Sequence, residues 1–340
     1  MNVILIPAYK PDEELLKLID ALAEKQLAIL VVDDGSGSEY EEIFAQAAKR
    51  AVVIHNSDNL GKGAALKKGM SELTSYYPEC THFITVDSDG QHRIEDILRV
   101  HEALIQGASM VLTIRDLHGN IPAKSKFGNT LSRWVYTLLT GHYLADNQSG
   151  LRGFSVTHIP WLLQVAGDKY DYEINVIYYA DKQDIDITTV SIESIYIDGN
   201  RSSHFEPALD TFRIYKCLFT SAKGTLIGAL LYEAAIIATS ILLGNQWWMF
   251  TIPASGILAA VVCLLIDRFS FRNIKPKKEI GTFVGSVLRS ILYTIGCGVV
   301  IKTLPKLPIL LVFNLFVLFM IPVRYNLHRL YTGRSRRHSA

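Results

Sequence analysis

The stretch Phe83-Ile-Thr-Val-Asp-Ser-Asp-Gly-Gln91 combines an apolar run with an abrupt polar ending. Its first four residues have the length and apolar character of a buried strand. We expect the carboxylates of Asp87 and Asp89 on one side of the strand end, with Gln91 adding a third oxygen. Because Mg²⁺ and Mn²⁺ bind oxygen ligands and bridge phosphates, the stretch predicts a divalent cation there. A twelve-residue calcium loop is excluded, because it would need a glutamate where Leu98 stands.

Similar apolar runs precede and follow this strand in the sequence, and they alternate with segments of helical hydrophobic spacing. Helices are predicted over Asp12–Lys25 and Lys62–Thr74. The predicted strands are Val3–Ile6, Ile29–Val32, Val52–His55, Phe83–Val86 and Met110–Thr113. This alternation is typical of an α/β domain with a mostly parallel sheet and helices on both faces. Ligands of such sheets gather at the carboxyl ends of the strands, so polar residues that follow strands are the candidates for a site.

Two further polar motifs follow predicted strands. Asp33-Asp-Gly-Ser36 places carboxylates where a base or ribose could hydrogen-bond, although an ordinary Asp-Gly turn explains the same residues. Asn59-Leu-Gly-Lys-Gly63 opens a predicted helix and could cradle a phosphate, but it is neither a full P-loop nor a dinucleotide fingerprint. A nicotinamide enzyme is disfavoured, because Pro7-Ala-Tyr-Lys-Pro11 follows the first strand in place of a glycine-rich turn.

The C-terminal part of the 340-residue chain is far more apolar than the part before it. Four segments approach membrane-spanning length, at 225–243, 247–266, 282–301 and 307–323. Any one of these segments could instead be a helix buried in a protein core, but this is improbable for four segments in about a hundred residues. Basic residues cluster after the second and fourth segments, so the positive-inside rule predicts that both termini are cytoplasmic. The net charge of +1 argues against a nucleic-acid-binding protein.

Two charged residues are expected inside the predicted membrane segments. Glu233 lies in the first and Arg289 at a similar depth in the third, and an ion inside a membrane indicates a functional site. We predict that they face each other, with snorkelling of Arg289 as the alternative. Apolar residues in 208–224 recur at helical spacing, which predicts an amphipathic interface helix. The predicted domains are 1–207, 208–224, 225–333 and a basic cytoplasmic tail, 334–340.

Five motifs, taken in their order and spacing, resemble glycosyltransferase family 2. They are Pro7-Ala-Tyr9, Asp33-Asp-Gly-Ser36, Asn59-Leu-Gly-Lys-Gly63, Asp87-Ser-Asp-Gly-Gln91 and Asn147-Gln-Ser-Gly-Leu-Arg152. The resemblance is to its dolichol-phosphate mannosyltransferase and bacterial polyprenyl-phosphate glycosyltransferase branch, over residues 1 to about 220. It implies an α/β catalytic domain of the Rossmann-like GT-A fold. Residues 225–333 are similar to a GtrA-like module, which implies an all-α domain of four transmembrane helices.

The resemblance also assigns roles by position. The residues around the donor nucleotide would be Pro7, Tyr9, Asp33, Asp34 and Lys62. Asp87 and Asp89 would meet the diphosphate and the metal, Mg²⁺ or Mn²⁺, with Gln91 as a further ligand. The donor and acceptor phosphates would meet Arg115, Lys124 or Lys126, and Arg201.

Catalysis is expected of four of these residues, Asp87, Asp89, Arg115 and Arg201. Glu173 matches a recurrent acidic position of the family for which no role is derived. For His92, a surface or supporting role is expected rather than catalysis.

The expected reaction moves one sugar, with inversion, from a UDP- or GDP-hexose to polyprenyl phosphate (undecaprenyl or dolichyl) at the cytoplasmic face of the cell membrane. The acceptor is already anionic, so no strong base is needed, and a cation and arginines stabilise the departing diphosphate. A processive polysaccharide synthase is one alternative, but the usual Gln-x-x-Arg-Trp motif lacks its Gln before Arg133-Trp134. A non-catalytic lipid-carrier binding or flippase subunit is another. The lipid bilayer is a further expected partner. The sequence does not decide whether the protein forms a homo-oligomer.

Overall fold

The computed structural model describes residues 1–116, 149–183, 185–193 and 248–270 as continuous stretches. The other described positions are 133, 136, 144, 146, 216, 227, 230–235, 237–238, 291–292, 295 and 311–312. The chain divides into two compact units. The first comprises Met1–Ser132, Ala145–Ala180 and Ile185–Leu218, and the second comprises Arg133–Leu144, Asp181–Asp184 and Phe219–Ala340.

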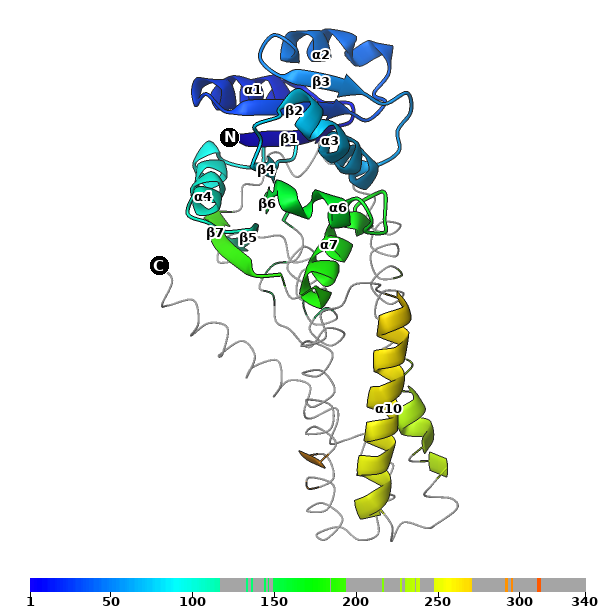
Figure 1. Ribbon diagram of the computed structural model, residues 1–340. Helices are drawn as coiled ribbons and strands as arrows, with labels where there is room; N and C mark the ends of the chain where they lie inside the picture. Colours follow the sequence, from blue (N-terminus) through cyan, green and yellow to red (C-terminus); the bar gives the residue numbers. More distant parts are fainter. Residues whose placement is uncertain are drawn as a thin grey trace. The chain divides into compact units, whose positions relative to one another are not determined.

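The first unit contains a sheet whose strands alternate with helices (Figure 1). The strands are β1 Asn2–Ala8, β2 Ala28–Asp33, β3 Val52–His55, β4 His82–Thr85, β5 Met110–Asp116, β6 Arg152–Ser155 and β7 Ile187–Glu193. The helices that begin in this unit are α1 Glu13–Glu24, α2 Glu41–Ala47, α3 Lys62–Tyr76, α4 Ile94–Ile105, α6 Ile159–Leu162 and α7 Asp171–Lys182. Two short 3-10 helices are η1 Ser38–Tyr40 and η2 Val156–His158.

The sheet has seven strands in the order β3-β2-β1-β4-β6-β5-β7. Strands β1, β2, β3 and β4 pair in parallel, as do β5 and β7, whereas β6 lies antiparallel between β4 and β5. The predicted mostly parallel α/β sheet is therefore confirmed. All strands except β6 end at the same edge of the sheet, and we call this edge the carboxyl edge.

The five strands and two helices predicted from the sequence all form. The strand predicted at Val52–His55 coincides with β3, and the other predicted strands differ from the observed bounds at one or both ends. Helix α1 starts after Asp12, whose side chain accepts a hydrogen bond from the amide of Glu14 at 3.0 Å and so caps the helix. Strands β6 and β7, and helices α2, α4, α6 and α7, had no counterpart among the predictions.

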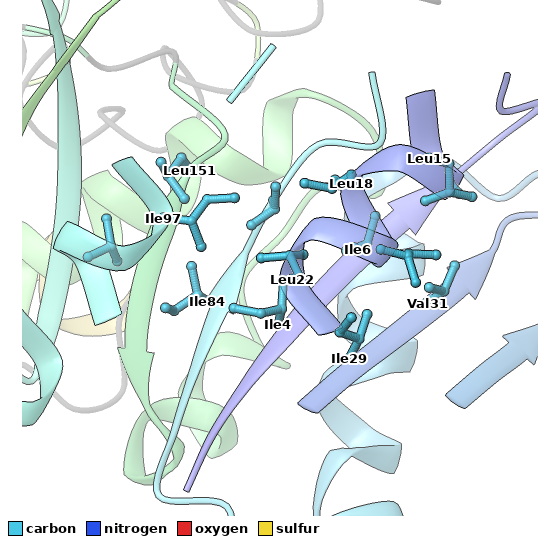
Figure 2. Packing of buried hydrophobic residues seen from close by; sticks show 14 of the residues in the cluster. Ile4, Ile6, Leu15, Leu18, Leu22, Ile29, Val31, Ile84, Ile97 and Leu151 are labelled. Atoms are coloured by element: carbon cyan, nitrogen blue, oxygen red, sulfur yellow. The ribbon is translucent and has the colours of Figure 1, made fainter. Parts of the chain in front are cut away.

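One hydrophobic core lies between the sheet and helices α1 and α4. Every second residue of β1 and β2 points into it, and Figure 2 shows Leu15, Leu18 and Leu22 of α1 gathered over these side chains. Each buried leucine contributes roughly 1.5–3 kcal/mol through removal from water. The core side chains labelled in the figure are Ile4, Ile6, Leu15, Leu18, Leu22, Ile29, Val31, Ile84, Ile97 and Leu151.

The alternate side chains of β1 and β2 meet helix α3. A Cβ atom on Gly69 of α3 would overlap with Leu5 and would come within 3.0 Å of Val32 Cγ2, so α3 packs closely on this side. Since successive residues of a strand point to opposite faces, α1 and α3 cover opposite faces of the sheet. The prediction of helices on both faces is confirmed.

In the second unit, helix α10 covers Trp248–Ser270 and contains Pro253. Its bounds are close to those of the second predicted membrane segment, 247–266. Among the helices in the described parts of the chain, none combines the length and apolar composition needed to cross a membrane. Most of the other three predicted segments, with Arg289, lies outside the described residues, as do the tail 334–340 and all of 208–224 except Lys216.

Candidate active site

Asp87 lies at the carboxyl edge, two residues beyond the end of β4. Its Oδ1 is 2.6 Å from Nζ of Lys62, the first residue of α3, and its Oδ2 is 3.6 Å from Nε2 of His92. Burial by itself would raise the pKa of Asp87, but the positive charge of Lys62 and the His92 ring outweigh it and hold that pKa below its usual range. Asp87 is therefore an anion at neutral pH, with its position fixed by α3.

Asp89 lies beside Asp87, but its pKa is shifted in the opposite direction. Burial raises the pKa of Asp89, and the negative charge of Asp87 raises it further. Its Oδ1 accepts a hydrogen bond from the backbone amide of Gln91 at 3.1 Å. Both carboxylates offer oxygen ligands, which a hard divalent cation prefers. Such a cation would also offset the repulsion between the two negative charges.

The predicted cation ligands are Asp87, Asp89 and the side-chain oxygen of Gln91. Within the described parts of the chain, no three His, Cys, Asp or Glu side chains are grouped to hold a metal ion. A site here would thus draw on two carboxylates, an amide and oxygens of the bound diphosphate, which is how Mg²⁺ is commonly bound with phosphate ligands.

Gly150, just before β6, forms the wall behind Asp87. A Cβ atom at position 150 would overlap with the Asp87 carboxylate and would lie 2.9 Å from its Cγ. The carbonyl of Gly150 accepts a hydrogen bond from the Thr85 hydroxyl at 2.9 Å, which ties this wall to the end of β4. The missing side chain at position 150 therefore leaves room for the Asp87 carboxylate.

A buried chain of charges continues from Asp87 into the protein. Nζ of Lys62 is 3.0 Å from Oε2 of Glu173, in the first turn of α7. The backbone carbonyl of Glu173 accepts a hydrogen bond from Nη1 of Arg152 at 2.6 Å, and Nε of Arg152 donates to the carbonyl of Ser149 at 2.9 Å. From the sequence, roles were predicted for Asp87 and Lys62 of these residues, whereas Arg152 was quoted only as part of a motif and no role was derived for Glu173.

Asp33, one of the predicted nucleotide-binding residues, is the last residue of β2. Its Oδ1 accepts the amide of Ser36 at 2.9 Å, and its Oδ2 lies 2.9 Å from Nδ1 of His55 at the end of β3. The Asp33–His55 pair lies at the carboxyl edge, because these two residues are partners in the parallel β2–β3 register. Of the predicted base neighbours, Pro7 is buried in β1 and Tyr9 follows it, with Nζ of Lys10 located 5.4 Å from the Tyr9 ring centre.

Asp34 supports the loop that precedes α3. Its carboxylate accepts hydrogen bonds from the Asn56 side chain at 2.9 Å and from the amides of Leu60 and Gly61 at 3.1 and 2.7 Å. Because these two amides are already bound to Asp34, they do not form the phosphate cradle predicted for Asn59–Gly63. The geometry gives Asp34 a role in holding this loop, and its predicted contact with the nucleotide stays a prediction.

Arg115 lies near the end of β5, at the same edge of the sheet. Its guanidinium binds Asp146 through Nε, 2.6 Å from Oδ2, and through Nη2, 3.0 Å from Oδ1. Asp146 precedes the motif that resembled the family and was not predicted. The predicted phosphate-binding residues Lys124, Lys126 and Arg201 lie outside the described residues.

His92 is more enclosed than a surface role would require. Its side chain is 9% exposed, and Nε2 faces the Asp87 carboxylate. The surface interpretation is therefore wrong for His92, whereas the supporting role remains, because the ring helps to hold the charge of Asp87.

Part of the chain is similar in sequence to known glycosyltransferases. Residues 3–154 match the family model Glycosyl transferase family 2. The UDP-N-acetylglucosamine–dolichyl-phosphate N-acetylglucosaminyltransferase of Methanococcus voltae is 26% identical over 217 residues, covering 57% of this chain and 86% of that protein. The polyprenol monophosphomannose synthase of Mycolicibacterium smegmatis is 28% identical over 215 residues, covering 56% of this chain and 76% of that protein.

Among solved structures, glucosyl-3-phosphoglycerate synthase from Mycobacterium tuberculosis, in complex with Mn²⁺ and UDP, is similar with a TM-score of 0.49. Its sequence is 16% identical, and the match covers 65% of this chain and 79% of that one. The family match spans nearly all of β1, the strands β2–β5 and the Asp87–Gln91 motif. Residues 3–154, which contain most of the mixed α/β sheet, thus match the family 2 glycosyltransferase model, and the protein is a glycosyltransferase.

Proposed function

We propose that the protein transfers one sugar from a UDP- or GDP-hexose to a polyprenyl phosphate, with inversion at the anomeric carbon. The observation that carries this proposal is the Asp87–Asp89 carboxylate pair at the carboxyl edge, next to the Lys62 ammonium. Relatives named for dolichyl-phosphate and polyprenol acceptors support the acceptor class. A carboxylate pair of this kind suits a diphosphate-containing donor, because it can share a divalent cation with the phosphates.

The residues Asp87, Asp89 and Gln91 would hold Mg²⁺ or Mn²⁺. When bound there, the cation supplies positive charge to the oxygens of the leaving diphosphate. A phosphate oxygen of the acceptor forms the new bond to the anomeric carbon, while the bond from that carbon to the donor phosphate oxygen breaks. The departing nucleoside diphosphate keeps the electron pair. The acceptor oxygen is already anionic, so no side chain has to remove a proton.

The remaining predicted residues bind and orient the two substrates. Asp33, braced by His55, would accept hydrogen bonds from the base or ribose, with Pro7 and Tyr9 beside it. Arg115, together with Lys124 or Lys126 and with Arg201, would bind phosphate oxygens. The bidentate contact with Asp146 would fix the plane of the Arg115 guanidinium.

The second half of the chain would attach the enzyme to the membrane that contains its acceptor. The proposed arrangement is a cytoplasmic domain, 1–207, an interface helix, 208–224, and a GtrA-like four-helix domain, 225–333, with both termini cytoplasmic. Large exposed apolar side chains of the second unit support a lipid-facing surface. They include Met249, Phe250, Ile257, Leu258, Val261 and Leu265 of α10.

The experiment incubates membranes that contain the full chain with radiolabelled UDP- or GDP-sugars and undecaprenyl or dolichyl phosphate, with and without Mn²⁺. We expect one mild-acid-labile lipid that carries a single sugar, formed with one donor class and lost in Asp89→Ala. Asp20→Ala, which removes an exposed carboxylate of α1, should retain transfer. A polymeric product would favour a processive synthase, and lipid binding without transfer would favour a non-catalytic carrier protein. Either result, or full turnover in Asp89→Ala, contradicts the proposal.

A further inference from the structure

Lys62 is shared between two carboxylates that come from different parts of the fold. Its ammonium is 2.6 Å from Asp87 and 3.0 Å from Glu173, and its side chain is 15% exposed. Asp87 belongs to the proposed cation site, whereas Glu173 lies behind it on α7. The charge of Lys62 is therefore divided between a carboxylate that is needed for the reaction and one that is not known to meet a substrate.

Glu173 is poorly explained as a purely stabilising residue. It is 8% exposed, and Oε1 of Glu173 and Nη2 of Arg152 have no hydrogen-bond partner among the described residues. Both residues line one cavity together with Thr85 and Tyr172. Burying a carboxylate with half of its oxygens unsatisfied costs free energy, and buried ion pairs are often replaceable by apolar residues without loss of stability. A functional reason is therefore needed for the negative charge at Glu173.

The charge balance around Asp87 supplies that reason. An ammonium 2.6 Å from Asp87 competes with a divalent cation for the same carboxylate. The carboxylate of Glu173, 3.0 Å from the same ammonium, offsets part of its positive charge. Without Glu173, Lys62 would pair with Asp87 alone, and the site would carry one more net positive charge.

We propose that Glu173 is a positioning residue that acts through Lys62 and sets the affinity of the Asp87–Asp89 site for a divalent cation. This inference rests on the proposed function, because it needs the cation site to exist. In this arrangement Lys62 orients the Asp87 carboxylate and Glu173 balances Lys62. The two residues therefore have opposite effects on cation binding, although they form one ion pair.

The chain contains a matched control for this pair. Lys67, also on α3, lies 3.1 Å from Oδ1 of Asp168, which precedes α7. The Asp168 side chain is 69% exposed, and the Lys67 ammonium also donates to the carbonyl of Gly167 at 2.8 Å. Asp168→Asn therefore removes a carboxylate that bridges the same two regions of the fold, without changing the charge next to the cation site.

The test measures the binding of Mn²⁺ alone to the purified full chain, from the loss of the free-ion electron paramagnetic resonance signal. Glu173→Gln should weaken Mn²⁺ binding about tenfold, at the lower end of the usual effect for residues that support metal ligands. Lys62→Met should tighten it, because the competing ammonium is gone. Asp168→Asn should bind like the unsubstituted protein. A purely structural role would weaken binding in both Glu173→Gln and Lys62→Met.

The double variant Lys62→Met/Glu173→Gln keeps the test decisive even where a single variant does not fold. It removes one positive and one negative charge, so its Mn²⁺ affinity should be close to that of the unsubstituted protein. If both substitutions only damaged the structure, their losses of Mn²⁺ affinity would add. Unchanged affinity in Glu173→Gln, or losses that add in the double variant, overturns the inference. If the unsubstituted protein fails to bind Mn²⁺, or Asp89→Ala binds it equally well, the cation site itself is refuted, and the inference with it.

Discussion

Asp146 binds Arg115 with both carboxylate oxygens, at 2.6 Å to Nε and 3.0 Å to Nη2. The amide of Arg115 also donates to Oδ2 of Asp146 at 3.3 Å, so side chain and backbone are held by the same group. Asp146 is buried, and Arg115 is the more exposed partner. A lysine at position 115 would not reproduce this contact, because an ammonium lacks the planar fork of a guanidinium.

Asp146→Asn should destabilise the protein strongly. It breaks an ion pair that is largely removed from water, and such a change typically costs about 3–5 kcal/mol. Thermal unfolding followed by circular dichroism measures the effect. Asp20→Asn is the control, because it breaks the exposed Asp20–Arg50 pair, which should contribute at most about 1 kcal/mol. Equal losses in the two variants would show that the Arg115–Asp146 contact is not the buried pair described.

Mn²⁺ should stabilise the folded protein when it binds the Asp87–Asp89 site. At a concentration one hundred times the dissociation constant, a ligand that binds only the native state adds about 2.7 kcal/mol to the free energy of unfolding. The melting temperature should therefore rise with Mn²⁺ and fall again when the ion is chelated. Asp89→Ala should show no such rise, and a rise equal to that of the unsubstituted protein would locate the bound ion elsewhere.

Gly150→Ala should impair transfer while leaving the fold largely intact. The added methyl group would collide with the end of the Asp87 side chain, which can rotate away, so the carboxylate is displaced more easily than the backbone. Displacement of a reacting group by about 1 Å can lower the rate on the order of a hundredfold. The measurement is turnover together with melting temperature.

Gly107→Ala serves as the control for that variant. Gly107 has a φ of +102°, and no atom lies within 4 Å of the place that a Cβ would take, so alanine strains the backbone there without touching the site. We expect a modest loss of stability with normal turnover at a permissive temperature. Normal turnover in Gly150→Ala as well would mean that Asp87 tolerates movement.

Cys80 should react slowly with thiol reagents in the folded protein. It is 6% exposed, and burial raises the pKa of its thiol to about 11. Only the thiolate is nucleophilic, so at pH 8 about one molecule in a thousand is reactive, and the rate should rise with pH. Peptide mapping after maleimide treatment measures labelling at Cys80, with urea-unfolded protein as the control. Rapid labelling of the native protein at pH 8 would contradict the burial of this residue.

The core of the fold was predictable because its signals are local. Val52–His55 contains three consecutive β-branched residues, and Asp12 with the acidic residues after it marks the start of α1. Strand β6 gave no such signal, because Arg152–Ser155 is short and contains an arginine and a glycine. It forms only because β4 and β5 supply partners on both sides, a relation between distant parts of the chain.

The position of Asp87 and Asp89 at the carboxyl edge was predictable, because polar residues that directly follow an apolar run indicate the end of a strand. The residues that support them were missed, because their roles depend on contacts across the sequence. Asp146 reads as an ordinary loop aspartate until Arg115 is placed beside it. Arg152 stood in a recognised motif, yet its contact with the carbonyl of Glu173 depends on the packing of α7. The hydrogen bonds from the Asp34 carboxylate to the loop before α3 were also missed, because they join residues that are more than 25 positions apart.

The reversed direction of β6 has a consequence for how such an enzyme can diversify. Strand β5 ends at the carboxyl edge and β6 begins at the same edge, so the two strands that flank the intervening segment meet it at the edge where Asp87 lies. Both anchor points belong to the sheet, and the strand order does not depend on the length of what joins them. Relatives can therefore differ in this segment and still keep the same strands around Asp87.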